Sequence, residues 1–176
     1  MTSSGRWVYL VASAAPPVLR IEGMVELLLG VRWNVGVIVT PTAAPWVDVE
    51  AIGARTGCLV RVAARAPGAE KSLPRADAVV AAPLTFNTVN KWAAGFSDSV
   101  ALGVLNELLS AEVPILAAPC VKALLRAHPA YGESIARLSA AGVTVLDPDA
   151  ITSRGPDGLA AFDWPRIAGE LERLIS

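Results

Sequence analysis

Residues 78–98 read AVVAAPLTFNTVNKWAAGFSD. The first five form an uninterrupted apolar run, which is typical of a strand covered on both faces of a sheet. The run ends at Pro83. Three polar side chains follow, Thr85, Asn87 and Thr88, at the start of a helix-compatible stretch. A buried strand, a polar turn and a helix in this order predict one unit of an α/β fold, with chemistry carried by the turn.

The same pattern recurs along the whole chain. Short apolar runs predict six strands, at residues 7–13, 35–40, 58–62, 78–82, 115–118 and 143–146. Helix-compatible stretches fall at residues 19–29, 47–55, 88–109, 131–141 and 164–175. Such alternation predicts an α/β fold, a doubly wound Rossmann- or flavodoxin-like three-layer sandwich with a six-stranded parallel sheet. The last helix is expected to start with Asp163 as its N-cap and Pro165 in its first turn.

Length and composition restrict the organisation of the chain. With 176 residues we expect residues 1–176 to form a single domain. Residues 147–162 contain two Pro, two Gly and three Asp, which predicts an irregular arm or mobile loop within that domain. The 53% hydrophobic content excludes disorder and favours surface buried in an oligomer.

Several classes of partner are disfavoured by charge and by residue counts. A net charge of −1 gives no basic field for nucleic acid. No apolar run reaches the roughly 18 residues of a membrane span, and no charged leader precedes an apolar core at the N-terminus. Two cysteines and one histidine make neither a disulfide framework nor a multi-histidine metal site. We therefore expect a cytoplasmic protein with no metal, nucleic-acid or membrane partner.

Polar residues gather where the predicted strands end. Ser13 ends the first strand, Thr40 ends the second, and Thr85 follows the fourth. In parallel sheets ligands bind at this edge, and a helix N-terminus offers backbone N–H groups to a phosphate. The pattern favours a phosphorylated ligand, although no GxGxxG dinucleotide fingerprint or P-loop is present.

The stretch from residue 82 to residue 98 resembles the signature of the homo-oligomeric flavin-containing cysteine decarboxylases. That signature reads Pro-Ala-Ser-Ala-Asn-Thr, followed by a Lys, a Gly and an Asp at set spacing. The residues that keep this register are Pro83, Asn87, Thr88, Lys91, Gly95 and Asp98, while Thr85 replaces the Ser. Weaker similarity extends the resemblance over roughly residues 7–146.

The resemblance implies a cofactor and an assembly. The cofactor would be flavin mononucleotide (FMN), bound without a covalent link. The residues expected to bind it are Ser13, Thr40, Pro83, Thr85, Phe86, Asn87, Thr88 and Asp98. The family also implies a homo-oligomer, a trimer that can stack into a dodecamer, with the flavin between neighbouring subunits.

Three departures from the family pattern bear on activity. The family's catalytic His falls before the fourth strand, and residues 69–77 contain none. Lys122 stands where the family's substrate-binding Asn is expected. The segment 147–162 lacks the Cys that phosphopantothenoylcysteine decarboxylases carry there, which disfavours that activity.

The favoured interpretation is oxidative decarboxylation of the C-terminal cysteine of a precursor peptide, giving an aminoenethiol. Lys122 and Asn87 are the catalytic candidates, with Lys122 holding the terminal carboxylate. General acid–base catalysis typically raises a reaction rate about 10²–10⁴-fold, so the absence of the His does not exclude activity. The alternatives are an FMN-binding member without decarboxylase activity, such as a regulatory subunit or a flavin prenyltransferase-like enzyme, and an oxidase of another small thiol. Lys122 as a solvated surface residue is the competing interpretation of that position.

Overall fold

The structure, a computed structural model, describes residues 5–69 and 73–176. Six parallel strands form the central sheet in the order β3-β2-β1-β4-β5-β6. The strands are β1 (Trp7–Ala12), β2 (Asn34–Val39), β3 (Leu59–Arg61), β4 (Ala78–Leu84), β5 (Ile115–Pro119) and β6 (Thr144–Val145). The predicted six-stranded parallel sheet is thus confirmed. The start of the chain, where a leader was judged absent, and Glu70–Ser72 in the histidine-free segment lie outside the described residues.

Strand order places the switch point of the sheet between β1 and β4. From β1 the chain moves outward to β2 and β3, then returns to β4 on the other side of β1. Leu10 on β1 pairs with Val37 on β2 and with Val80 on β4, and all three side chains are fully buried. Ligands of doubly wound sheets bind at the carboxyl ends of the strands at this switch point.

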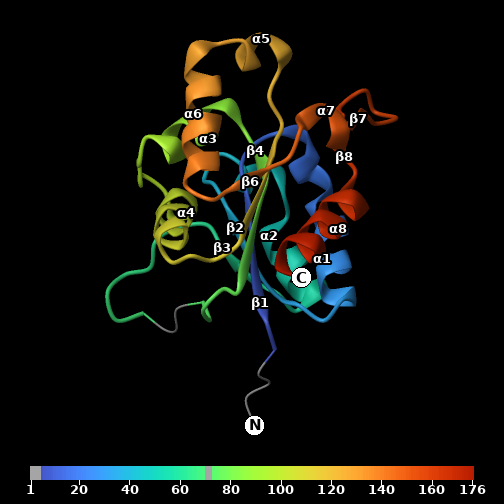
Figure 1. The fold of residues 1–176 in the computed structure, drawn as a ribbon. Coiled ribbons are helices and arrows are strands. Elements are labelled where there is room, and N and C mark those ends of the chain that lie inside the picture. The colour runs from blue at the N-terminus through green and yellow to red at the C-terminus, as the bar shows by residue number, and fades with distance from the viewer. Residues whose placement is uncertain (1–4, 70–72) are drawn as a thin grey trace.

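Helices cover both faces of the sheet (Figure 1). They are α1 (Ile21–Gly30), α2 (Val49–Thr56), α3 (Phe86–Ala93), α4 (Val100–Ser110), α5 (Ala123–Arg126), α6 (Pro129–Ala140), α7 (Pro148–Ile151) and α8 (Trp164–Ile175), with short 3-10 turns at Pro16–Arg20 (η1) and Ala44–Trp46 (η2). One core layer joins α1, α2 and α8 to the sheet, and the other joins α3, α4 and α6. Three layers result, as predicted.

The final helix starts as the sequence predicts. The Asp163 side chain accepts a hydrogen bond from the Arg166 N–H at 3.0 Å, and Pro165 occupies the first turn. The buried face carries Trp164, Ile167 and Leu171. This helix packs on α1, and the indole of Trp33, in the connection from α1 to β2, donates to Glu172 at 3.0 Å.

The single helix predicted at residues 88–109 is wrong. It is two helices, α3 and α4, separated by a turn in which Gly95 has φ +80°. This left-handed conformation favours glycine and ends the first helix. Ser99 then caps the second helix by accepting from the Leu102 N–H at 3.2 Å. The break places Asp98 beside α3 instead of along one continuous helix.

The prediction of an irregular arm at residues 147–162 is also wrong. This segment holds α7 and an antiparallel hairpin of β7 (Thr152–Arg154) and β8 (Ala160–Phe162). Buried Ile151 and Phe162 anchor its ends in the core. At the turn the Asp157 carboxylate accepts from the Leu159 N–H at 3.0 Å. The Pro, Gly and Asp residues of this segment therefore mark two ordered features, the start of α7 and the hairpin turn at residues 155–159.

No described helix is long and apolar enough to cross a membrane. Within residues 5–69 and 73–176, no cluster of three His, Cys, Asp or Glu side chains could hold a metal ion.

Candidate functional site

Two neighbouring cavities open at the carboxyl edge of the sheet, and both are lined by Ala14, Thr85 and Asn87. The first has a volume of about 380 Å³ and is rich in hydroxyl groups. Its lining residues are Ser13, Ala14, Thr40, Pro41, Thr42, Thr85, Asn87, Thr88, Lys91, Asp98, Ser99 and Leu102. The second, of about 700 Å³, is more apolar and lies between the β4–α3 turn, α5 and the hairpin. The two cavities meet at the switch point.

Ser13 ties the ends of β1 and β4 together beneath the first cavity. Its backbone N–H and its hydroxyl both donate to the Pro83 carbonyl at 2.9 Å. Its Oγ also accepts from the Thr85 N–H at 2.9 Å. Because the only hydroxyl hydrogen is used internally, this buried serine can offer a ligand an acceptor but no donor.

Two threonine hydroxyls in the same cavity keep their hydrogens free. Thr85 caps α3 by accepting from the Thr88 N–H at 3.2 Å, and it donates to the Thr88 hydroxyl at 3.0 Å. Thr40 accepts from the Ala43 N–H at 3.3 Å. Among the described residues, no acceptor receives the hydroxyl hydrogens of Thr40 or Thr88. These two side chains can therefore donate to a ligand.

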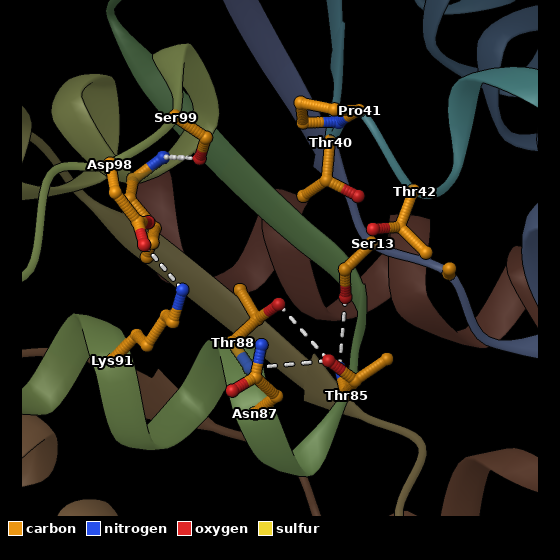
Figure 2. A pocket seen from close by; sticks show the side chains of 12 residues that line it. Ser13, Thr40, Pro41, Thr42, Thr85, Asn87, Thr88, Lys91, Asp98 and Ser99 are labelled. Atoms are coloured by element: carbon orange, nitrogen blue, oxygen red, sulfur yellow. Dashed lines mark hydrogen bonds and ion pairs between the residues drawn. The ribbon is translucent and has the colours of Figure 1, made fainter.

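An ion pair closes the opposite side of the first cavity (Figure 2). The Lys91 ammonium on α3 contacts the carboxylate of Asp98, which precedes α4. Their side chains are 34% and 53% exposed, so the pair adds little to stability. It supplies the cavity wall with one cation and one carboxylate. Asn87, one turn earlier on α3, is exposed with its side-chain amide free to bind a ligand.

The second cavity begins where β5 ends. The Cys120 N–H donates to the Leu84 carbonyl at 2.9 Å, and Cys120 lines the cavity. Burial raises the pKa of this thiol above its ordinary value of 9.0, so Cys120 is a poor nucleophile at neutral pH. Lys122 is the N-cap residue of α5 and is exposed at the rim. The cavity therefore pairs an apolar interior with a cationic rim.

Comparison with known families decides the identity of this scaffold. Residues 1–170 match the family described as Flavoprotein. The chain belongs to this flavoprotein family. The predicted family resemblance is thereby confirmed.

Three relatives illustrate how this flavoprotein compares with known proteins. The coenzyme A biosynthesis bifunctional protein CoaBC of Thermococcus kodakarensis is 34% identical over 74 residues, which is 42% of this chain but only 18% of that protein. The FMN-dependent cysteine decarboxylase TvaF from thioviridamide biosynthesis has a TM-score of 0.72 at 23% identity, covering 82% of this chain and 91% of that one. EpiD in complex with the substrate peptide DSYTC has a TM-score of 0.75 at 16% identity, covering 98% and 99%. At these identities the two structures establish a common fold.

Most of the predicted flavin-contacting residues come together. Six line the first cavity: Ser13, Thr40, Thr85, Asn87, Thr88 and Asp98. Two lie elsewhere. Pro83 is buried at the end of β4, and its carbonyl serves Ser13. Phe86 lines the second cavity, stacked on Tyr131 at 6.5 Å between ring centroids and edge-on to His128 at 5.7 Å. Pro83 thus positions the strand end, and Phe86 faces the apolar side of the site.

The first cavity of this flavoprotein fits the polar half of a flavin nucleotide. A ribityl phosphate carries hydroxyls and anionic oxygens, and the cavity offers hydroxyl donors, a free amide and a lysine ammonium. The N-terminus of α3 opens beside it, where backbone N–H groups and the helix dipole favour a phosphate. The adjoining apolar cavity offers a surface for a flat ring.

Sequence reasoning missed part of each cavity. In the first cavity, Lys91 kept the family register but was not predicted to bind the cofactor, and Ser99 was not considered at all. A serine four residues past a glycine was the available signal for a second helix start. Arg126, Thr152 and Arg154 line the second. The latter two lie on the hairpin, so an arm assigned as irregular gave no reason to consider them. The lone His128 caps α6, because its Nδ1 accepts from the Ala130 N–H at 3.1 Å.

Proposed function

We propose that this flavoprotein is an FMN-dependent decarboxylase that acts on the C-terminal cysteine of a peptide. The observation that carries the proposal is the junction of a hydroxyl-rich cavity with an apolar, cation-rimmed cavity at the switch point of the sheet. A cofactor with its polar half in the first cavity and its ring at the junction would meet a substrate in the second at Thr85 and Asn87. Family membership supports a flavin-dependent decarboxylase. TvaF, which shares the fold, is described as a cysteine decarboxylase, and the substrate peptide bound to EpiD ends in cysteine.

FMN is the cofactor that the family and its FMN-dependent members indicate. When bound, it supplies a two-electron acceptor for oxidation of the cysteine. Thr40 and Thr88 would donate hydrogen bonds to its ribityl phosphate, and Ser13 would accept one. Asn87 lines both cavities, so its amide can orient the ring edge and the substrate together.

Lys122 would attract and orient the substrate carboxylate. Water and salt screen the attraction of an exposed ammonium for a carboxylate. Lys122 is exposed at the rim, so its attraction contributes to substrate binding more than to the chemical step. Holding the carboxylate more tightly in the ground state would not speed its loss as CO₂. We therefore expect Lys122 to affect KM more than kcat.

The histidine-free segment 69–77 favours one alternative, an FMN-binding member without decarboxylase activity, such as a regulatory subunit or a flavin prenyltransferase-like enzyme. Both proposals require bound FMN, so only turnover separates them. Phosphopantothenoylcysteine decarboxylase is disfavoured because residues 147–162, which form α7 and the hairpin, contain no cysteine. Oxidation of a different small thiol would use the same two cavities.

Assembly and location complete the proposal. We expect a trimer, which can stack into a dodecamer, working in the cytoplasm with no nucleic-acid or membrane partner. Light scattering coupled to size exclusion measures the first expectation directly. A monomer at micromolar concentration would contradict it.

The test uses the FMN-loaded protein and a synthetic peptide ending in cysteine, with loss of CO₂ and two hydrogens followed by mass spectrometry. Wild-type protein should convert this peptide and leave the matched serine-ending peptide unchanged. Lys122→Ala should raise KM about two- to fivefold with kcat little changed, and Lys122→Asn should retain part of the binding. Arg173→Gln, which removes an exposed cation of α8, is the charge-matched control. FMN binding without any peptide conversion would favour the non-decarboxylating alternative.

A further inference from the structure

The second cavity contains two buried polar atoms that lack a hydrogen-bond partner. In the described part of the chain, three buried side-chain atoms have no hydrogen-bond partner: Nε1 of Trp92, Nε of Arg126 and Oγ1 of Thr152. Arg126 and Thr152 both line the second cavity, whereas Trp92 belongs to the core of α3. A buried donor without an acceptor is unfavourable, which marks the cavity wall as a place where a ligand oxygen would be stabilised.

Arg126 is held in place by a partner that leaves part of its guanidinium unused. It ends α5, and its Nη2 donates to the Asp149 carboxylate on α7 at 3.0 Å. That interaction holds the planar group against the cavity wall, but the Nε–H has no acceptor. A guanidinium has five N–H donors, so it can hold Asp149 and a second anion at once.

Thr152 comes from a different wall of the same cavity. It starts β7, directly after α7, so the helix that positions Arg126 also leads into this strand. Its hydroxyl is buried and unpartnered, although hydroxyls normally find a partner when buried. Figure 1 places α5 and the hairpin at the end of the sheet where the strands finish. Both groups therefore belong to the lining of one cavity, on walls that come from different elements.

The charge of the wall selects the sign of the ligand. Lys122, Arg126 and Arg154 contribute three positive charges, against the single carboxylate of Asp149. Arg154 also donates to the Gly158 carbonyl at 2.7 Å, which keeps its charge at the hairpin turn. The net positive lining beside an otherwise apolar cavity favours a small carboxylate attached to an apolar or thiol-bearing group.

We propose that Arg126 and Thr152 form the recognition site for the α-carboxylate of the substrate's terminal cysteine, with the Arg126 Nε–H and the Thr152 hydroxyl as donors. The inference rests on the proposed function. It adds the residues that would make substrate binding depend on a free carboxylate at the end of the substrate. Arg126 is a specificity residue here, and exposed Lys122 acts only at the rim. An amide-ended substrate would bring no charged acceptor to the Arg126 Nε–H.

Binding of matched ligands to the FMN-loaded protein tests the site. The probes are a cysteine-ending peptide and its C-terminal amide, together with N-acetylcysteine and N-acetylcysteine amide, measured by calorimetry. Wild-type protein should bind each acid roughly 10- to 100-fold more tightly than its amide. Arg126→Gln should abolish that preference, and Thr152→Val, which removes only the hydroxyl, should reduce it severalfold. Arg173→Gln should leave it unchanged, and FMN affinity in both cavity variants should match wild type.

The outcomes separate this inference from the proposed function. If the peptide is decarboxylated but Arg126→Gln still prefers acids, the recognition site is wrong and the function stands. If N-acetylcysteine shows an Arg126-dependent preference but no peptide binds, the site stands and the peptide substrate is wrong. Equal affinity for acids and amides in wild-type protein, or no binding of any probe, overturns the inference.

Discussion

Ser13→Ala is the substitution that most directly probes how the site is built. The change removes the hydroxyl that donates to the Pro83 carbonyl and accepts from the Thr85 N–H, both at 2.9 Å. Two hydrogen bonds at about 0.5–1.5 kcal/mol each give roughly 1–3 kcal/mol. The Pro83 carbonyl keeps the Ser13 N–H as a donor, but the half-buried Thr85 N–H loses its acceptor. We therefore expect a value in the upper half of that range, about 2–3 kcal/mol.

Urea unfolding of the flavin-free protein, followed by circular dichroism, measures this loss. Ser99→Ala is the matched control, because Ser99 lines the same cavity but only caps α4 with a single hydrogen bond. Loss of such a cap costs about 1 kcal/mol. Ser13→Ala should also weaken FMN binding in a fluorescence titration, since it loosens the junction of β1 and β4. If Ser13→Ala is no more destabilising than Ser99→Ala, the serine does not hold the strand ends together.

Three further predictions follow from single residues. Asn87→Asp places a carboxylate where a neutral amide faces the ligand and should lower FMN affinity about tenfold. The melting temperature should not change, because this side chain is exposed. Full FMN affinity in the variant would refute the role of Asn87. Asp163→Ala removes the N-cap of α8 and should cost about 0.5–2 kcal/mol in urea unfolding, with FMN affinity intact. In a Cys58→Ser background, iodoacetamide should alkylate Cys120 more slowly than free cysteine at pH 8, and the rate should still rise above pH 9, because a raised pKa leaves less thiolate at each pH; a plateau below pH 9 would contradict this.

Apolar strand runs made the sheet predictable. Strands buried on both faces, such as β1 and β4, leave a continuous apolar signal, and the polar residues directly after them mark the ligand edge. Ser13, Thr40 and Thr85 were found in this way, and all three line the first cavity. The sequence does not show which of these hydroxyls already donates a hydrogen bond within the protein. Ser13 donates to Pro83, which is 70 residues away in sequence, so only the structure shows it.

The second cavity was only partly predictable because its walls depend on local structure with weak sequence signals. The hairpin has strands of three residues each, too short for an alternating pattern, and its turn residues resemble those of a loop. Helix α5 is a single turn. Arg126 and Thr152 are 26 positions apart, and no sequence pattern predicts that they line one cavity. In the structure α7 brings their walls together.

A single-turnover reaction under anaerobic conditions tests the central claim most directly. The FMN-loaded protein is mixed with an equimolar amount of a cysteine-ending peptide, and the visible absorbance of the flavin is recorded beside the peptide mass. We expect the yellow absorbance to bleach as the peptide loses CO₂ and two hydrogens, with one product formed for each flavin reduced. A flavin that stays oxidised beside an unchanged peptide, in a protein that has bound FMN stoichiometrically, would contradict the proposed decarboxylase.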